Sequence, residues 1–215
     1  GVTAIVNEFG SVIVLEDDLV TSSFFLQFMN DALHKYRSNE NVWHISGWNY
    51  PIDMNIKEHI FFWRTMNCWG WATWRDRWNN FEKNPSALIR EWDMETIKSF
   101  DLDNSNVFWR QIKDNNSGLI DTWAIFWYAT IFQRKGLCLN PSRTLVRNIG
   151  LDGSGINCGK NNEFSTDDIF DQEYQLVFPD EPVLSLKATK EIIGFYKRRN
   201  SLQSKLRRKL KAILG

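Results

Sequence analysis

The chain has little cysteine, no long apolar run and no visible signal peptide. Its three cysteines, Cys68, Cys138 and Cys158, stand far apart without a CxxC pair. This spacing argues against a disulfide framework and against a cysteine zinc site, and it is typical of proteins of the reducing cytosol. No apolar stretch approaches the roughly 20 residues that cross a bilayer. The sequence therefore predicts a cytoplasmic protein without a membrane span.

Net charge is also absent, because 26 Lys and Arg balance 26 Asp and Glu. Residues 197–215 nevertheless carry eight cations and no acid. This distribution argues against a uniformly basic nucleic-acid binder. Leu202, Leu206 and Leu210 form one helical stripe among these cations, so residues 197–214 are predicted to lie on an anionic membrane surface. A solvated tail, or a helix packed on the domain or on a partner, is the alternative.

The chain is rich in apolar and aromatic residues. Of its 215 residues, 43% are apolar, which is enough for one large domain with a real core. Eleven residues are tryptophan, and an indole face can pack in a core or stack on the C–H face of a sugar ring. We expect most of the eleven in the core and a few exposed in a carbohydrate groove. The three histidines are scattered along the chain and are predicted to be structural.

The most informative segment is residues 11–18, where a β-branched run ends in Glu16, Asp17 and Asp18. Such a run is typical of a buried parallel strand, and ligands of open α/β sheets bind beyond the carboxyl ends of the strands. Carboxylates there can hold a hard divalent cation that bridges nucleotide phosphates. The alternative is a solvated acidic turn that caps the next helix.

Hydrophobic periodicity places further elements around this strand. Helices are predicted over 2–9, 24–36, 85–99, 105–115 and 121–135, and strands over 11–15, 42–47, 61–64 and 137–141. Three parts follow: a main domain over 1–165, a linker over 166–188 and a basic helical tail over 189–215. The chain opens almost directly into a core strand and has no initiator Met, so we expect upstream βα units to be missing.

Five ordered segments carry a family resemblance: Glu16–Asp18, Cys68–Trp78, Gly118–Trp123, Asn140–Ser142 and Asn148–Gly155. Together they resemble the bacterial sugar transferases related to the N-acetylglucosaminyltransferase I group. The resemblance implies an α/β fold of the GT-A type, with a mixed sheet flanked by helices. It also implies sugar transfer from a nucleotide-sugar donor, with a UDP-sugar favoured, assisted by Mn²⁺ or Mg²⁺. The acceptor would be a saccharide or a lipid-linked saccharide of surface polysaccharide or lipopolysaccharide.

The resemblance also suggests roles for individual acids. Asp18 would contact the metal, Asp17 would orient the metal water shell or the donor ribose, and Glu16 would contact the donor sugar or the loop. Asp121 is the candidate general base for an inverting transfer, with Asp114 as a weaker substitute. The alternative for Asp121 is a helix N-cap, because Asp before Thr favours that position.

Two further segments complete the expected donor or acceptor pocket. Trp69, Gly70 and Trp71 would line it, with Gly70 allowing close backbone approach. The Gly-rich loop, with Gly153 and Ser154, would close over the donor. The family has a histidine where this chain has Asn157, whose amide oxygen is a weaker ligand for a hard metal. Arg143 and Arg147 stand nearby as alternative phosphate-binding cations, as does Arg75. Trp74 and Trp78 are expected to face the core, with Arg75, Asp76 and Arg77 pairing at the surface.

Two other functions stay open at this point. A non-catalytic sugar-binding or scaffold protein of a polysaccharide assembly would share the tryptophans and the fold. A nucleotidyltransferase would share the sheet and the acids, but it would need a Gly-rich, basic phosphate loop near its start, and this chain has none.

Overall fold

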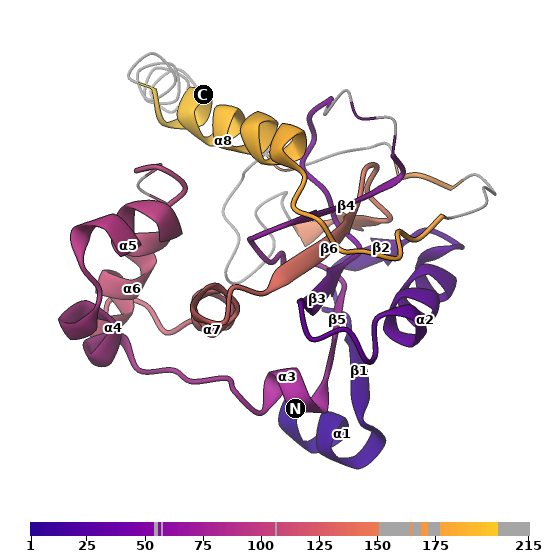
Figure 1. Ribbon diagram of the computed structural model, residues 1–215, viewed down its shortest axis with the longest axis horizontal. Coiled ribbons are helices and arrows are strands. Elements are labelled where there is room, and N and C mark those ends of the chain that lie inside the picture. The colour runs from indigo at the N-terminus through magenta and orange to yellow at the C-terminus, as the bar shows by residue number, and fades with distance from the viewer. Residues whose placement is uncertain are drawn as a thin grey trace.

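A computed structural model describes residues 1–53, 56, 58–105, 107–150, 164, 169–171 and 177–201. It shows an α/β fold in which a mixed sheet lies between helical layers (Figure 1). The sheet has five strands in the order β1-β5-β3-β6-β4. Their bounds are β1 Ser11–Val14, β3 Val42–Ser46, β4 Ile60–Trp63, β5 Trp71–Trp74 and β6 Leu137–Pro141.

The only parallel pair described in this sheet is β3 with β6. β5 runs antiparallel to both of its neighbours, β1 and β3, and β4 runs antiparallel to β6. The prediction of a buried parallel strand over 11–15 is therefore wrong in two respects. β1 lies at one edge of the described sheet with an antiparallel neighbour, and only Val12 of its four residues is buried.

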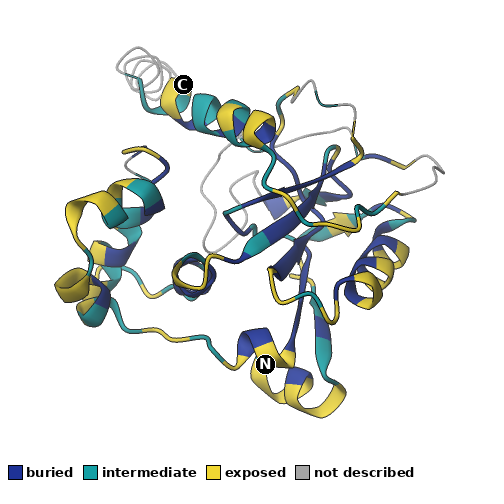
Figure 2. Cartoon of the chain, viewed as in Figure 1, coloured by how far each residue is buried: buried dark blue, intermediate teal, exposed yellow. Residues whose placement is uncertain are grey.

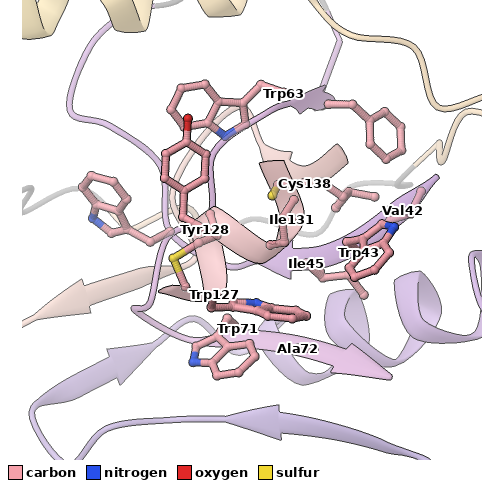
Figure 3. Packing of buried hydrophobic residues seen from close by; sticks show 14 of the residues in the cluster. Val42, Trp43, Ile45, Trp63, Trp71, Ala72, Trp127, Tyr128, Ile131 and Cys138 are labelled. Carbon is pink, nitrogen blue, oxygen red and sulfur yellow. The ribbon is translucent and has the colours of Figure 1, made fainter. Parts of the chain in front are cut away.

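Two helices cover opposite faces of the sheet. α2 (Phe25–Lys35) lies on the face of Trp74, whose indole N–H donates to the carbonyl of Leu33 at 3.1 Å. α7 (Ala124–Gln133) lies on the other face, where seven consecutive α7 residues from Ile125 to Ile131 are buried. Figure 3 shows Trp127 and Ile131 of this helix among the strand residues. α7 is buried on most of its circumference because α6 and the α4–α5 segment lie outside it (Figure 1).

The remaining helices surround this three-layer centre. They are α1 (Val2–Phe9), α3 (Arg75–Trp78), α4 (Pro85–Glu91), α5 (Met94–Phe100), α6 (Phe108–Asn116) and α8 (Leu186–Asn200). The expected single helix over 85–99 is two helices. It breaks because Asp93 adopts an extended conformation and its side chain caps α5 by accepting from the Thr96 N–H at 2.8 Å.

A small two-stranded ribbon stands beside the main sheet. β2 (Leu19–Thr21) pairs antiparallel with β7 (Val146–Asn148), with Leu19 opposite Asn148 and Val20 opposite Arg147. Neither segment is predicted as a strand by its hydrophobic pattern. Because β2 follows Asp18 at once, this ribbon holds the acidic segment against residues far along the chain.

The sheet and the helix faces that cover it are mostly buried (Figure 2). All eleven tryptophans are described and none is exposed, so the expectation of exposed indoles is wrong. Trp74 and Trp78 are buried, as predicted. Arg77 is only 4% exposed; besides its ion pair with Asp76, it donates to the carbonyls of Val42, Arg37 and Asn39. Arg77 therefore pairs within the structure rather than at the surface.

Candidate functional site

The acidic segment lies where β1 ends, as the sequence predicts. The backbone at Asp18 is tied to the segment after β7, since the Ile149 N–H donates to the Asp18 carbonyl at 2.8 Å. Asn148 donates through its side-chain amide to Oδ2 of Asp18 at 3.1 Å. The oxygen of the same amide accepts from the Gly150 N–H at 2.8 Å. Asn148 thus links the carboxylate of Asp18 to the backbone that approaches it.

The two carboxylate oxygens of Asp18 differ in their hydrogen bonding. Oδ1 is buried and makes no hydrogen bond with any residue that the structure describes. Gly150 lies so close that a Cβ there would stand 2.7 Å from Oδ2 and 3.2 Å from the Asp18 Cβ. A buried carboxylate oxygen without a partner is costly, and such a group is usually compensated by a proton, a donor or a cation. The carboxylate of Asp18 is therefore held in one orientation by Asn148, and the burial of its Oδ1 is not compensated by any of the described residues.

Glu16 and Asp17 extend from the same turn and are exposed. Partial desolvation, and then repulsion by the carboxylates of Asp18 and Asp17, raise the pKa of Glu16 above its ordinary value. A positive ion beside these acids would relieve that repulsion. The turn is thus a concentration of negative charge at the end of a strand. No group of three or more His, Cys, Asp or Glu side chains able to hold a metal exists within the described part of the chain.

The Trp69–Trp71 segment places its three residues in different surroundings. Gly70 has φ +63°, and a Cβ there would stand 2.9 Å from a methyl of Val146 and 3.0 Å from the Phe25 ring. This close approach requires glycine. Trp71 is fully buried and stacks on His44, so its expected place in the pocket wall is wrong. Trp69 is half-buried and does line a cavity.

A chain of contacts brings the start of α7 to the same end of the sheet. Val14, the last residue of β1, lies opposite Trp71 in β5, and Trp71 stacks on Trp123 at 5.3 Å between ring centroids. Asp121 precedes Trp123 by two residues. α7 begins at Ala124 with Trp123 as its N-cap and no side-chain cap, so the helix-cap alternative for Asp121 is wrong.

The side chain of Asp121 is 94% exposed and forms an ion pair with Lys83. The ammonium of Lys83 also lies 5.5 Å from the centre of the Phe126 ring, which places the pair against α7. Asp114, the weaker candidate, pairs with Arg110 within α6 at 3.4 Å. Asp121 is thus a solvent-accessible carboxylate whose single described ionic partner is a lysine.

The three arginines considered as phosphate-binding residues, Arg143, Arg147 and Arg75, lie in different surroundings. The guanidinium of Arg143 lies 4.4 Å from the centre of the Phe170 ring. Arg147 adjoins Asn148 in β7, and successive strand side chains point to opposite faces, so Arg147 faces away from the Asp18 contact. Arg75 donates to the Asn7 carbonyl at 3.3 Å, beside α1. The expected donor contacts Gly153, Ser154 and Asn157 lie outside the described residues, as does Cys158.

A cavity of about 200 Å³ opens beside Trp69. Its walls are mainly aromatic, with Trp48, Tyr50, Trp69, Phe108, Tyr128, Phe164 and Tyr196 contributing. Its amide-bearing lining residues are Asn67 and Gln111. The residues around it belong to the segments after β3 and before β5, to α6, to α7 and to α8. Sequence periodicity could not bring these segments together, so of this cavity only Trp69 was predicted.

His44 lies below this region and is structural, as expected. It is fully buried; its Nδ1 accepts from the Trp127 indole N–H at 3.3 Å, which leaves Nε2–H to donate to the Asn67 carbonyl at 3.0 Å. Burial lowers the pKa of His44 to about 3. The imidazole is therefore neutral at physiological pH and fixes the backbone at Asn67. His34 and His59 are exposed.

The basic C-terminal segment begins as part of the fold. α8 starts at Leu186, and Ala188, Ile192 and Tyr196 on one face are buried. Figure 1 shows α8 running over β4, and the Ser185 N–H donates to the Phe62 carbonyl at 2.8 Å. No helix of the described chain is long and apolar enough to cross a membrane. The leucine stripe of the predicted membrane-surface helix lies beyond Ser201, outside the described residues.

Sequence reasoning did not assign a role to Asn148 or Gly150. The available signal was the Asn-Ile-Gly run immediately before the Gly-rich loop, where glycine marks a close backbone approach. No protein-family model matches this chain, and no curated protein matches it. The site is thus defined by its geometry alone.

Proposed function

We propose that this protein is a metal-dependent glycosyltransferase. It transfers a sugar from a nucleotide-sugar donor, with a UDP-sugar favoured, to a hydroxyl of a saccharide or lipid-linked acceptor. The observation that carries the proposal is the carboxylate of Asp18, which Asn148 orients through Oδ2 while Oδ1 stays buried without a partner. An oriented hard oxygen ligand at the carboxyl end of a sheet strand suits a divalent cation bound together with phosphates.

The carboxylate oxygens of the acidic turn suit Mn²⁺ or Mg²⁺. Both are hard cations that carboxylate oxygens bind, and Mg²⁺ is commonly held by one or two carboxylates together with substrate phosphates. Asp18 fits this arrangement, with Asp17 beside it in the sequence. Such a cation, when bound, neutralises the diphosphate leaving group as its bond to the sugar breaks. Asn148 would act by orienting Asp18, as hydrogen-bond partners of metal ligands do.

Asp121 is the proposed base. Its exposed carboxylate would take the proton of the acceptor hydroxyl while that oxygen forms a bond to the anomeric carbon. The bond from that carbon to the diphosphate breaks on the opposite face, so the configuration inverts. Lys83 would orient the carboxylate. We place the protein in the cytoplasm, peripheral to the inner face of the membrane, where lipid-linked acceptors of surface polysaccharide are found.

A second candidate function is sugar binding without catalysis, as part of a polysaccharide assembly. The observation that favours it is the aromatic cavity, which can hold a sugar ring whether or not a nucleotide binds. The two functions differ in one property, metal-dependent binding of a nucleotide.

Calorimetric titration of the full chain with UDP, GDP and CMP, in Mn²⁺ and in chelator, tests the proposal. We expect one nucleotide to bind only with Mn²⁺, and Asp18→Asn to weaken it about tenfold or more. Asp31→Asn, at an exposed acid of α2, is the matched control and should leave binding unchanged. Absence of binding by every nucleotide would overturn the transferase proposal, and metal-independent binding would overturn the role of Asp18.

A further inference from the structure

The cavity beside Trp69 has no role in the chemistry described so far. Trp69 is joined to Gly70, and Gly70 lies against Val146, two residues before Asn148. The cavity is therefore linked to the Asp18 site through the packing of Gly70 on Val146 and through β7, which carries Asn148. We propose that this cavity binds one uncharged sugar ring, and that in the transferase this ring belongs to the acceptor saccharide.

The walls are suited to a pyranose. Trp48 stands between two aromatic neighbours, with ring centroids 5.0 Å from Trp69 and 4.8 Å from Tyr50, both edge to face. These contacts fix the rings, so little side-chain freedom is lost when a ligand binds. Sugar rings present apolar C–H faces, which pack on aromatic faces of this kind.

Polar groups accompany the aromatic rings in the same walls. The Nδ2 of Asn67 is buried and has no hydrogen-bond partner among the described residues. The hydroxyls of Tyr50 and Tyr196 lie 2.8 Å apart, and both side chains are at most 5% exposed. Burial raises the pKa of Tyr196 to about 12 and the pKa of Tyr50 well above its ordinary value, so both phenols are protonated. One phenol proton forms the bond between them, and we assign the other phenol as a donor to a sugar oxygen.

The chemistry of the described lining residues and the volume of the cavity limit which ligands it can hold. None of the described residues that line the cavity carries a charge. A nucleotide phosphate or a uronic acid would enter without a counter-ion, at a large desolvation cost. A volume of about 200 Å³ lies below the roughly 300–1,000 Å³ typical of pockets for drug-sized ligands. One neutral ring with hydroxyl oxygens as acceptors meets these conditions, whereas a whole nucleotide does not.

Only the identification of this ring as the acceptor rests on the proposed function. The proposal that the cavity binds a neutral sugar does not rest on the proposed function, because neither Asp18 nor a bound nucleotide would form part of the cavity wall. The test is therefore built so that the two proposals can fail separately.

Saturation-transfer NMR on the full chain would use the methyl glycosides of glucose, galactose, mannose and N-acetylglucosamine, with methyl glucuronide and uridine as comparators. We expect at least one neutral glycoside to bind, and Trp69→Ala to weaken it about tenfold, which corresponds to the loss of one aromatic contact. Asn67→Leu should weaken it several-fold, since it removes a donor while the backbone carbonyl that His44 contacts remains. Trp109→Ala, at a half-buried tryptophan outside the cavity, should leave it unchanged.

Binding of a neutral glycoside that depends on Trp69 and Asn67, and that Asp18→Asn leaves unchanged, would support the inference even if no nucleotide binds. Nucleotide binding without any glycoside binding would overturn the inference and leave the transferase proposal standing. Preference for uridine or for the glucuronide, lost in Trp69→Ala, would also overturn it, because the cavity would then hold the donor base or an acidic ring.

Discussion

The side-chain amide of Asn148 donates to Oδ2 of Asp18 at 3.1 Å and joins two segments 130 residues apart in the chain. The other oxygen, Oδ1 of Asp18, is buried and has no hydrogen-bond partner in the described part of the chain. Orientation of a carboxylate by a neighbouring amide is the arrangement in which metal ligands are usually found. The bond therefore connects the acidic turn after β1 with β7 in one candidate site.

Asn148→Ala should weaken Mn²⁺-dependent nucleotide binding by about tenfold or more, because Asp18 loses its orienting donor. Calorimetry with the nucleotide that the intact chain binds measures the effect. Asn30→Ala is the control, since Asn30 is exposed and its amide contacts only the Leu26 carbonyl of its own helix. Unchanged affinity in Asn148→Ala would show that the Asp18 carboxylate does not need this bond to act.

Gly150→Ala should also weaken nucleotide binding, because the added Cβ would stand 2.7 Å from Oδ2 of Asp18 and displace the carboxylate. Gly194→Ala in α8 is the matched control, where the nearest atom is the end of the flexible Arg198 side chain at 3.2 Å. We expect that control to keep full affinity and to gain up to about 1 kcal/mol of stability from helix propensity. Equal affinities in the two variants would argue against close contact between Gly150 and the ligand-binding carboxylate.

Asp121→Asn should lower the rate of sugar transfer by about 10²–10⁴-fold, since an amide cannot accept the proton of the acceptor hydroxyl. Nucleotide binding should stay as in the intact chain, because Asp121 lies outside the Asp18 site. Release of nucleoside diphosphate from the preferred donor gives the rate. Asp114→Asn serves as the comparison: if it lost more activity than Asp121→Asn, the assignment of the base would pass to α6.

The lowered pKa of His44 predicts that the free energy of unfolding depends on pH. Its pKa is about 3 in the fold and near 6.5 when exposed, so between these values the unfolded chain binds a proton that the folded chain does not. The free energy of unfolding should therefore fall as pH decreases from 6.5 towards 3, by on the order of 1 kcal/mol per pH unit from this group.

His44→Gln retains one donor and one acceptor but does not titrate. Urea unfolding at several pH values should give a shallower decline for this variant than for the intact chain. Parallel declines in the two proteins would show that the imidazole takes up its proton without unfolding.

Several elements could be predicted from periodicity alone. The helix expected over 24–36 is α2, Phe25–Lys35, and the strand expected over 42–47 is β3, Val42–Ser46. Such segments are predictable because their burial repeats with the period of the element. The split between α4 and α5 was missed because one capping side chain, Asp93, outweighs a continuous apolar pattern.

The candidate site was predicted only in part for a similar reason. The position of the acids after β1, and the choice of the Trp69–Trp71 segment as a candidate pocket wall, follow from local sequence. Trp71 has the same composition around it as Trp69, yet it is a core residue, because it lies within β5 between β1 and β3, whereas Trp69 precedes the strand and is separated from it by Gly70 with φ +63°. No local pattern reveals which of the two indoles meets the cavity.

By itself the sequence determined the local elements, the aromatic content of the core and the cluster of acids at the end of a strand, because these depend on residues close together in the chain. The tertiary structure decided that β5 lies between β1 and β3 and that β7 pairs with β2. These pairings bring Asn148 and Gly150 to Asp18, and they set Trp69 beside Trp48 and Tyr50. Contacts of this range depend on how whole elements pack, and no periodicity within one segment specifies them.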